Sequence, residues 1–168
     1  MFREMRRKRQ LLSEAETVAV MERGTAGVLA LLDQDGYTYA VPLSYVYNRA
    51  EKRIFFHSAT SGHKLEAIAH HQKVSFCVID QDQIVPEELT TYFRSAIAFG
   101  EIYAVTDEAA KVAALKLLGA KYLPSDPVRV MQSVEKSLAA VTILAMTVEK
   151  LSGKEAIELV RAKAAKGR

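Results

Sequence analysis

The sequence predicts a single mainly β domain with added helices, an α+β fold in which about six strands form a small barrel, closed or partly closed. The length of 168 residues suits one domain, on the usual range of about 100–200 residues. The alternating apolar segments are joined mostly by short turns, which favours antiparallel pairing. No period of 20–50 residues repeats, which argues against a solenoid or a propeller. We therefore expect residues 1–168 to form one sheet that curves on itself, with helices at its ends.

Periodicity and turn chemistry predict the individual elements. Strands are expected at 26–32, 37–47, 53–58, 73–80, 91–105 and 138–148. Helices are expected at 13–23, 60–70, 107–121 and 126–137, and from 152 to the C-terminus at 168. Ser13 and Ser152 each precede a glutamate at capping-box spacing, and Asp126 precedes a proline, so all three residues are expected helix caps. The polar segment 81–90 is expected to be a loop.

Three local signals refine this scheme. Asp33-Gln34-Asp35-Gly36 has the composition of a tight turn and predicts a hairpin between the first two strands. Pro42 lies inside the second strand, and a proline cannot donate to a strand ladder. It therefore belongs on a sheet edge, at a bulge, or where a ligand meets the backbone. Gly100 interrupts a long strand and predicts a bulge or a close approach of another chain segment.

Charge is concentrated at the N-terminus. Residues 1–10, the basic arm, hold five basic residues against Glu4, so the rest of the chain carries about −1 of the net charge of +3. This distribution gives no basic domain face for nucleic acid. The arm itself is either solvated or loosely attracts an anionic partner. No apolar segment follows it, so it is not a signal peptide, and no apolar run is long enough for a membrane helix.

The chain has one cysteine, Cys77, which excludes an intrachain disulfide and suits a reducing compartment, so we expect a cytoplasmic protein. Cys77 lies within an apolar strand, and we interpret it as a buried structural thiol. Among the four histidines, His63 and His70 could share a helix face. Without a third ligand this pair does not make a zinc site, and no metal is expected.

The segment Phe55-Phe56-His57-Ser58-Ala59-Thr60-Ser61-Gly62-His63-Lys64 has the most unusual composition. A strand runs into small hydroxyl residues, a glycine and two potential cations at the start of a helix. Free N–H groups and the positive end of the helix dipole favour anions at such a position. The alternative is an ordinary capped helix with a solvated lysine. Likewise, Tyr39-Ala40-Val41-Pro42-Leu43-Ser44 could lie along a flat aromatic ligand or be a plain barrel strand.

These segments occur in an order that resembles a known family. After Tyr39–Tyr47, Ile54–Ala59 and Gly62-His63-Lys64 come Val74-Ser75-Phe76, Ser95–Gly100 and Ser152-Gly153-Lys154. The order is similar to that of the FMN-binding split-barrel proteins related to pyridoxamine 5′-phosphate oxidase, and within them to the NimA-like branch of 5-nitroimidazole resistance proteins. The opening Met5-Arg6-Arg7-Lys8 also resembles that branch.

The resemblance implies a six-stranded antiparallel split barrel that forms a homodimer with FMN at the subunit interface. It implies that the ring system lies against Val41, Pro42, Leu43 and Ser44, and that Phe56, His57 and Ser58 follow the ring and the ribityl chain. Gly62, His63 and Lys64 would hold the phosphate, and Ser95 would be a further contact. His57 matches the histidine that the branch places near the reactive face of the flavin.

The sequence departs from the oxidase itself. The cationic residues that flank the strand matched by Tyr39–Ser44 are absent, and His63 stands where the oxidase has an arginine. These departures argue against pyridoxamine phosphate as substrate. The leading hypothesis is a reductase of small acceptors such as 5-nitroimidazoles, in which His57 orients the acceptor or supplies a proton. The alternatives are a flavin- or haem-binding protein without turnover and a module whose basic arm binds an anionic partner.

Overall fold

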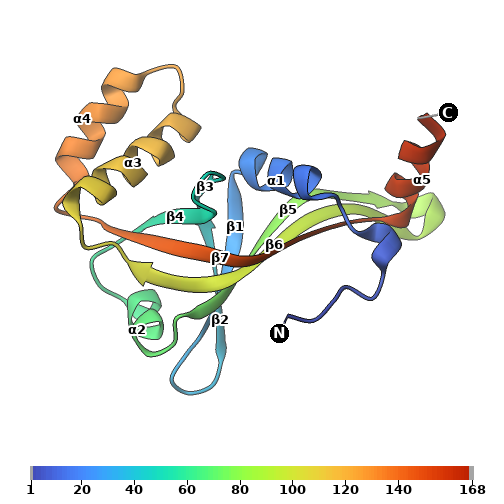
Figure 1. The fold of residues 1–168 in the computed structure, drawn as a ribbon, viewed down its shortest axis with the longest axis horizontal. Helices are drawn as coiled ribbons and strands as arrows, with labels where there is room; N and C mark the ends of the chain where they lie inside the picture. Colours follow the sequence, from blue (N-terminus) through green and yellow to red (C-terminus); the bar gives the residue numbers. More distant parts are fainter. Residues whose placement is uncertain (1, 167–168) are drawn as a thin grey trace.

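The computed structural model describes residues 2–166, which form five α-helices and one sheet (Figure 1). The strands are β1 (Ala26–Leu32), β2 (Thr38–Ser44), β3 (Val46–Asn48), β4 (Arg53–Ser58), β5 (Lys73–Val85), β6 (Thr90–Ala104) and β7 (Thr142–Glu155). The helices are α1 (Glu14–Arg23), α2 (His63–His70), α3 (Glu108–Tyr122), α4 (Pro127–Ser137) and α5 (Ile157–Lys166), and short 3-10 turns lie at Lys8–Gln10 and Pro86–Glu88.

The sheet has the strand order β2-β1-β5-β6-β7-β4-β3 and is antiparallel throughout. It has seven strands where six were expected, and it is curved but not closed. The predicted α+β class with an open antiparallel barrel is therefore confirmed. Aromatic side chains pack together among the aliphatic residues of its interior: the ring of Phe76 meets those of Tyr45 and Phe56 edge-on, with centroids 4.8 and 5.0 Å apart.

The extra strand arises because the segment expected at 37–47 divides at Tyr45. The backbone N–H of Tyr45 donates to the Tyr122 hydroxyl at 2.8 Å, and the fully buried Tyr45 ring places its own hydroxyl 2.7 Å from the Met21 carbonyl. These bonds take Tyr45 out of the ladder, so β2 pairs only with β1 while β3 pairs with β4. Pro42 thus lies on an edge strand, as its missing N–H predicted.

The expected loop at 81–90 was wrong. β5 and β6 continue through most of this segment as a long hairpin, closed by the turn Pro86–Glu88 and by Leu89 in the left-handed region. A bulge after Ile79 changes the register, and Arg94 there forms salt bridges with Asp80 and Glu155. The polar composition that predicted a loop instead belongs to a hairpin that extends beyond the core, where both faces meet solvent (Figure 1).

The C-terminal boundary was also wrong. The helix expected from Ser152 begins at Ile157, because β7 runs to Glu155 and pairs Ser152 and Gly153 with β6. Glu155 is only 3% exposed and forms salt bridges with Arg94 and Lys163. Glu155, whose spacing from Ser152 fits a capping box, is therefore a buried partner of two cations. At the other end of this strand, residues 138–141 precede β7.

The helix starts predicted at Ser13, Asp107 and Asp126 are confirmed, whereas the helix expected from residue 60 begins at His63. Ser13 and Glu16 form the capping box of α1, and the Asp107 and Asp126 side chains accept N–H bonds at the starts of α3 and α4. The predicted bulge at Gly100 is present as a register shift between Phe99 and Gly100. A Cβ at Gly100 would lie 1.8 Å from the Thr147 carbonyl oxygen, so β7 approaches too closely for any side chain.

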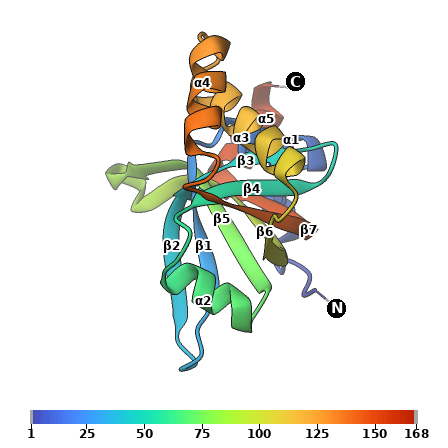
Figure 2. The same ribbon diagram turned by 90° about the vertical axis from the view of Figure 1, so that its left-hand side faces the viewer.

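The helices occupy different parts of the sheet (Figures 1 and 2). α3 and α4 form a hairpin over the end of β4, whereas α5 lies near the tip of the β5–β6 hairpin. The end of α3 is anchored by Lys121, whose Nζ donates to the Gly24 carbonyl at 2.5 Å and lies 3.9 Å from the centroid of the Tyr45 ring. Burial lowers the pKa of Lys121 to about 8.

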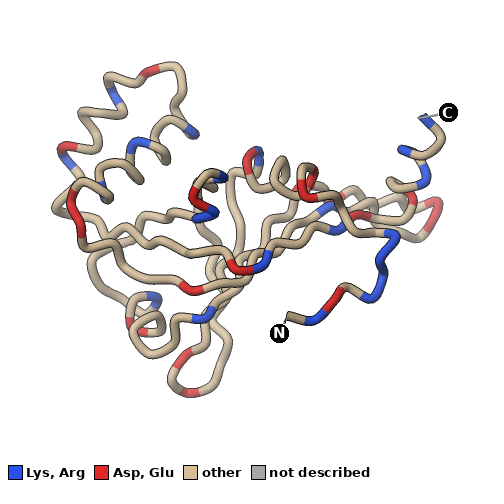
Figure 3. The backbone as a smooth tube through the Cα atoms, in the orientation of Figure 1, with Lys and Arg blue, Asp and Glu red and all other residues tan. Residues whose placement is uncertain are grey.

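The basic arm crosses the sheet away from α3 and α4, and its lysine and arginine residues form the longest blue stretch of the backbone in Figure 3. Leu12 joins it to β7 through an N–H bond of 3.0 Å to the Gly153 carbonyl. Near the start of the arm, the rings of Phe2 and Phe99 have centroids 5.7 Å apart. None of the helices within residues 2–166 has the length and apolar character that crossing a membrane requires.

Candidate functional site

The predicted anion-binding segment forms the connection from β4 to α2. Gly62 is the N-cap of α2 and has φ +124°, a conformation that favours glycine. Its carbonyl accepts the first helical bonds, from the N–H groups of Leu65 and Glu66. The N–H groups of His63 and Lys64 precede these bonds, and nothing lies within 4 Å of the position of a Cβ at Gly62. The start of α2 is therefore open and has the unused donors that an anion needs.

Lys64 is half-buried beside this open helix start. Burial lowers the pKa of its ammonium group. Within residues 2–166, no carboxylate lies within 4.0 Å of Lys64 Nζ, so no acidic group of this part of the chain compensates the charge. A partly desolvated cation of this kind is expected to bind an external anion.

His63 has a different environment from Lys64. Its Nε2 contacts the Asp33 carboxylate, and its ring stacks on Tyr39 with centroids 4.2 Å apart and planes 20° apart. The hydrogen bond with Asp33 raises the pKa of the His63 imidazole and lowers that of the Asp33 carboxyl. His63 is thus held against the β1–β2 hairpin. A phosphate would have to displace the Asp33 carboxylate to pair with the His63 ring.

The predicted ring-binding residues of β2 divide between the two faces of the strand. Val41 and Leu43 pack against the interior core, whereas Pro42 and Ser44 are exposed on the opposite face. β4 alternates in the same way: Phe56 and Ser58 are buried, and His57 is exposed. Ser95 lies on β6, paired with Ile79 and Lys154, and shares the outward face of the sheet with Ile97.

Ser44 and His57 meet in one cavity of about 620 Å³ between β4 and the α3–α4 hairpin, which we call the α3–α4 cavity. Its remaining walls come mostly from the two helices, and include Tyr122 and Arg129. Sequence reasoning missed these helical residues. The only available signal was the apolar spacing of α4 behind its Asp126 cap, which predicts a helix but not what the helix covers.

A row of apolar side chains crosses the outward face of the sheet. The strand registers align Pro42, Val28, Cys77 and Ile97 on neighbouring strands, and Ile79 lies on the same face and is 64% exposed. Cys77 was expected in the core. It is half-buried on this outer face instead, and burial raises the pKa of its thiol. Exposed apolar rows of this kind mark surfaces that bind another molecule.

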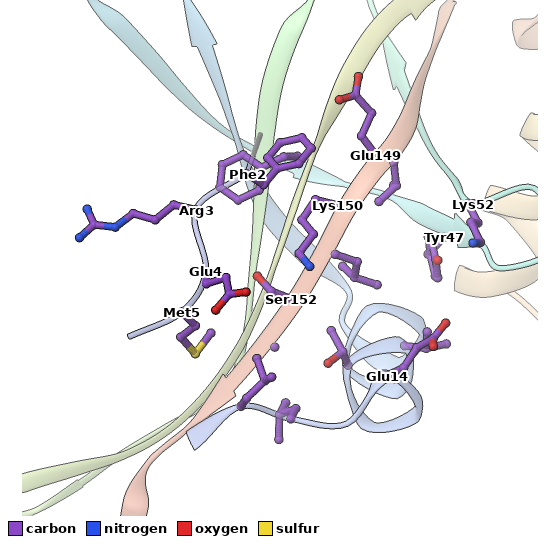
Figure 4. Close-up of a pocket in the computed structure, with 18 of the residues that line it drawn as sticks. Phe2, Arg3, Glu4, Met5, Glu14, Tyr47, Lys52, Glu149, Lys150 and Ser152 are labelled. Carbon is purple, nitrogen blue, oxygen red and sulfur yellow. The ribbon is translucent and has the colours of Figure 1, made fainter. Parts of the chain in front are cut away.

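A larger hollow of about 980 Å³ separates the basic arm from α1 and β7 (Figure 4). Phe2, Lys150 and Ser152 are among the residues around it, and Glu4 extends toward Ser152 in this view. None of the predicted site residues lines this hollow. The predicted residues thus lie in four places: the start of α2, the α3–α4 cavity, the outward face of the sheet, and the interior, where Val41, Leu43, Phe56 and Ser58 lie.

Comparison with known proteins agrees with this architecture. A family model described as pyridoxamine 5′-phosphate oxidase matches residues 13–155. A proposed 5-nitroimidazole antibiotic resistance protein from Bacteroides thetaiotaomicron superposes with a TM-score of 0.71 at 20% identity, covering 86% of each chain. The FAD and haem binding protein from Mycobacterium smegmatis gives 0.74 at 23% identity, covering 88% of this chain and 73% of that one.

A third similar structure is the flavocytochrome Anf3 from Azotobacter vinelandii, with a TM-score of 0.77 at 17% identity over 91% of this chain and 72% of that one. No curated protein sequence matches the chain. The open antiparallel sheet and its structural neighbours define a split-barrel fold. The chain belongs to the pyridoxamine 5′-phosphate oxidase family, whose model covers most of its length.

Proposed function

We propose that this protein binds FMN and is an oxidoreductase that acts on small acceptors. The observation that carries the proposal is Lys64, which is half-buried beside the open start of α2 and has no carboxylate partner among residues 2–166. A phosphate there would accept hydrogen bonds from the backbone N–H groups of His63 and Lys64 and from the Lys64 ammonium group. The names of the structural neighbours, which include a FAD and haem binding protein, support a flavin over other phosphate compounds.

The residues at the start of α2 fit the charge of the FMN phosphate. The open space at Gly62 leaves room for a phosphate, and Ser58 at the end of β4 adds a hydroxyl. The exposed side of β2, with Pro42 and Ser44, offers a surface whose proline needs no ladder partner. His63 contributes to the phosphate site mainly through its backbone N–H, because its ring is held by Asp33.

A second copy of the chain would complete the site. The apolar row Pro42, Val28, Cys77 and Ile97 begins on the strand that carries the proposed ring-binding residues. Packing two such faces together would bury these side chains and bring Ser95 of one copy toward the flavin of the other. We therefore include a homodimer, with FMN at the interface, in the proposed function.

Bound FMN would supply electron transfer, while the chain would supply the binding site and a proton donor. His57 is exposed on β4 within the α3–α4 cavity, so its imidazole can meet a small acceptor there. An imidazole is a common proton donor in catalysis, so His57 can donate a proton to a reduced product. The nitro group of a 5-nitroimidazole is the acceptor that the similarity to the Bacteroides protein supports.

The second candidate is a flavin- or haem-binding protein without turnover. The names of the flavocytochrome and of the FAD and haem binding protein favour it, because both describe proteins of this fold by their bound groups. The two candidates differ in whether a bound flavin is reduced by NADH or NADPH and then reoxidised by an added acceptor.

The experiment is a visible absorption spectrum of the freshly purified protein, followed by titration of the flavin-free protein with FMN. The proposal expects a flavin spectrum or saturable FMN binding, then anaerobic reduction by NADH, NADPH or a flavin reductase. Reoxidation by a 5-nitroimidazole would support the oxidoreductase. FMN binding without reduction would favour the second candidate, and absence of FMN binding would remove both flavin proposals.

A further inference from the structure

We propose that the α3–α4 cavity is a separate binding site for a compact apolar molecule that carries a carboxylate or another acceptor-rich group, such as a nitro group. The proposal deepens the proposed function, on which it rests, by naming the class of small molecule that meets His57. The volume of about 620 Å³ lies within the range of small-molecule sites, about 300–1,000 Å³.

The walls of the cavity select an apolar body. Leu118 on α3 and Val130 and Val134 on α4 are buried side chains that line it, and Leu115 and Val141 add to the same surface. Apolar walls with a few polar groups are the usual composition of a small-ligand site. A ligand ring placed here would replace water against leucine and valine side chains.

The cavity is not the result of helices that fail to meet. A Cβ at Gly119 on α3 would lie 2.3 Å from Val130 Cγ1 on α4, so the two helices are in direct contact. The Tyr122 hydroxyl is bonded to the backbone of Tyr45 and Thr25 at 2.6–2.8 Å, which fixes the end of α3 to the sheet. The hollow therefore lies between elements that are held in place.

The polar groups of the cavity favour an acceptor-rich ligand. Its lining includes the basic residue Arg129, the imidazole of His57 and the hydroxyl of Ser44, and contains no aspartate or glutamate. Within residues 2–166, no salt bridge involves the Arg129 guanidinium; only its backbone N–H is bonded, to the Asp126 carboxylate. An unpaired guanidinium matches a carboxylate in charge and geometry.

The test uses two probes of the same size, 4-nitrobenzoate and its neutral relative 4-nitrobenzyl alcohol. Each is titrated into ¹⁵N-labelled protein and followed by amide chemical shifts. We expect saturable shifts on α3, α4 and around His57 with both probes. Arg129→Ala should weaken the affinity for 4-nitrobenzoate about tenfold and leave the affinity for the alcohol nearly unchanged, because only the carboxylate loses a charged hydrogen bond. Arg161→Ala on α5 is the matched control and should change neither.

A second variant tests the position of the site without relying on charge. Ser133 is exposed and lines the cavity from α4, so Ser133→Trp should fill the hollow and abolish the shifts from both probes. The amide spectrum of this variant verifies its fold. Shifts outside the α3–α4 region, equal 4-nitrobenzoate affinity in Arg129→Ala, or unchanged binding in a folded Ser133→Trp variant would each overturn the proposal.

An FMN titration of the wild-type protein distinguishes failure of this site from failure of the proposed function. If FMN binds and neither probe does, the cavity assignment falls and the flavin assignment stands. If the probes bind as expected and FMN does not, the ligand site stands and its link to a flavin falls.

Discussion

Two neighbouring cations, His63 and Lys64, have opposite electrostatic situations. Asp33 holds the His63 ring, while Lys64 is half-buried without a carboxylate among residues 2–166. Burial without compensation raises the free energy of a charged group, and an external anion removes that cost. The chemistry of the proposed phosphate site therefore depends on Lys64 more than on the histidine beside it.

The pairing of His63 with Asp33 has a defined pH dependence. The pKa of His63 is raised, so its contribution to stability is complete below the ordinary value of 6.5 and is lost as pH rises through the folded value. The pKa of Asp33 is lowered, so its contribution is lost only as pH falls through that lowered value. Asp33→Asn should return the His63 pKa toward 6.5, measured by imidazole chemical shifts. An unchanged His63 titration would show that the pair does not form.

His57 is the residue for which the account expects an effect on turnover alone. His57→Ala removes an exposed side chain of β4 that lines the α3–α4 cavity. FMN affinity should stay close to wild type, and the rate of acceptor reduction should fall about 10²–10⁴-fold, the usual contribution of a positioned proton donor. Steady-state kinetics with a 5-nitroimidazole measure this. Equal rates would show that His57 has no such role.

At the residue scale, sequence reasoning found the segments that carry the site but not their partners. Gly62 and Lys64 were identified because glycine and lysine at a helix start form a local pattern. Asp33 lies 30 residues from His63, and Arg129 lies 72 residues from His57, so no local spacing relates them. Such pairs are created by the fold of the sheet and by the α3–α4 hairpin.

At the scale of elements, helix starts and hairpin turns were predictable because short patterns of caps and turn residues determine them. Two of the errors in this fold lie where tertiary contacts overrode local chemistry. The polar segment 81–90 became part of the β5–β6 hairpin, and Ser152 became a strand residue because β7 pairs with β6 as far as Glu155. A glutamate that is buried in the fold and one that caps a helix can follow a serine at the same spacing, so the sequence alone does not distinguish them.

Gly100 tests the packing of β6 against β7. A Cβ at this position would lie 1.8 Å from the Thr147 carbonyl oxygen, so Gly100→Ala requires the backbone of β7 to move. We expect a loss of about 1–3 kcal/mol in the free energy of unfolding, the usual cost of overpacking. Urea denaturation followed by circular dichroism measures it. A variant as stable as wild type would mean that the two strands are farther apart than described.

For the molecule as a whole, the outward face of the sheet carries an apolar row that a second copy of the chain would cover. The row from Pro42 to Ile97 is apolar and open to solvent, and it begins on the strand with the proposed ring-binding residues. A monomer would not need apolar side chains on this solvent-exposed face. Dimerisation would cover the row and enclose the flavin in one step.

Ile97→Glu tests this arrangement. Ile97 is 36% exposed at the β6 end of the row, so a charge there should dissociate a homodimer and weaken FMN binding with it. Leu117→Glu on α3, where the leucine is 39% exposed, is the matched control and should leave the dimer intact. Sedimentation velocity measures the molecular mass. A monomeric wild-type protein, or an Ile97→Glu dimer of wild-type affinity, would contradict the proposed interface.

The central claim is that a flavin is held by its phosphate at the start of α2. It is tested most directly by comparing the affinities of FMN and riboflavin, which lacks the phosphate, for wild type and Lys64→Ala. We predict that wild type prefers FMN, and that Lys64→Ala weakens FMN by about 1–3 kcal/mol while riboflavin affinity is unchanged. The exposed Lys73→Ala control should behave as wild type. Equal affinity of wild type for both flavins, or an equal loss of both in Lys64→Ala, would contradict the account.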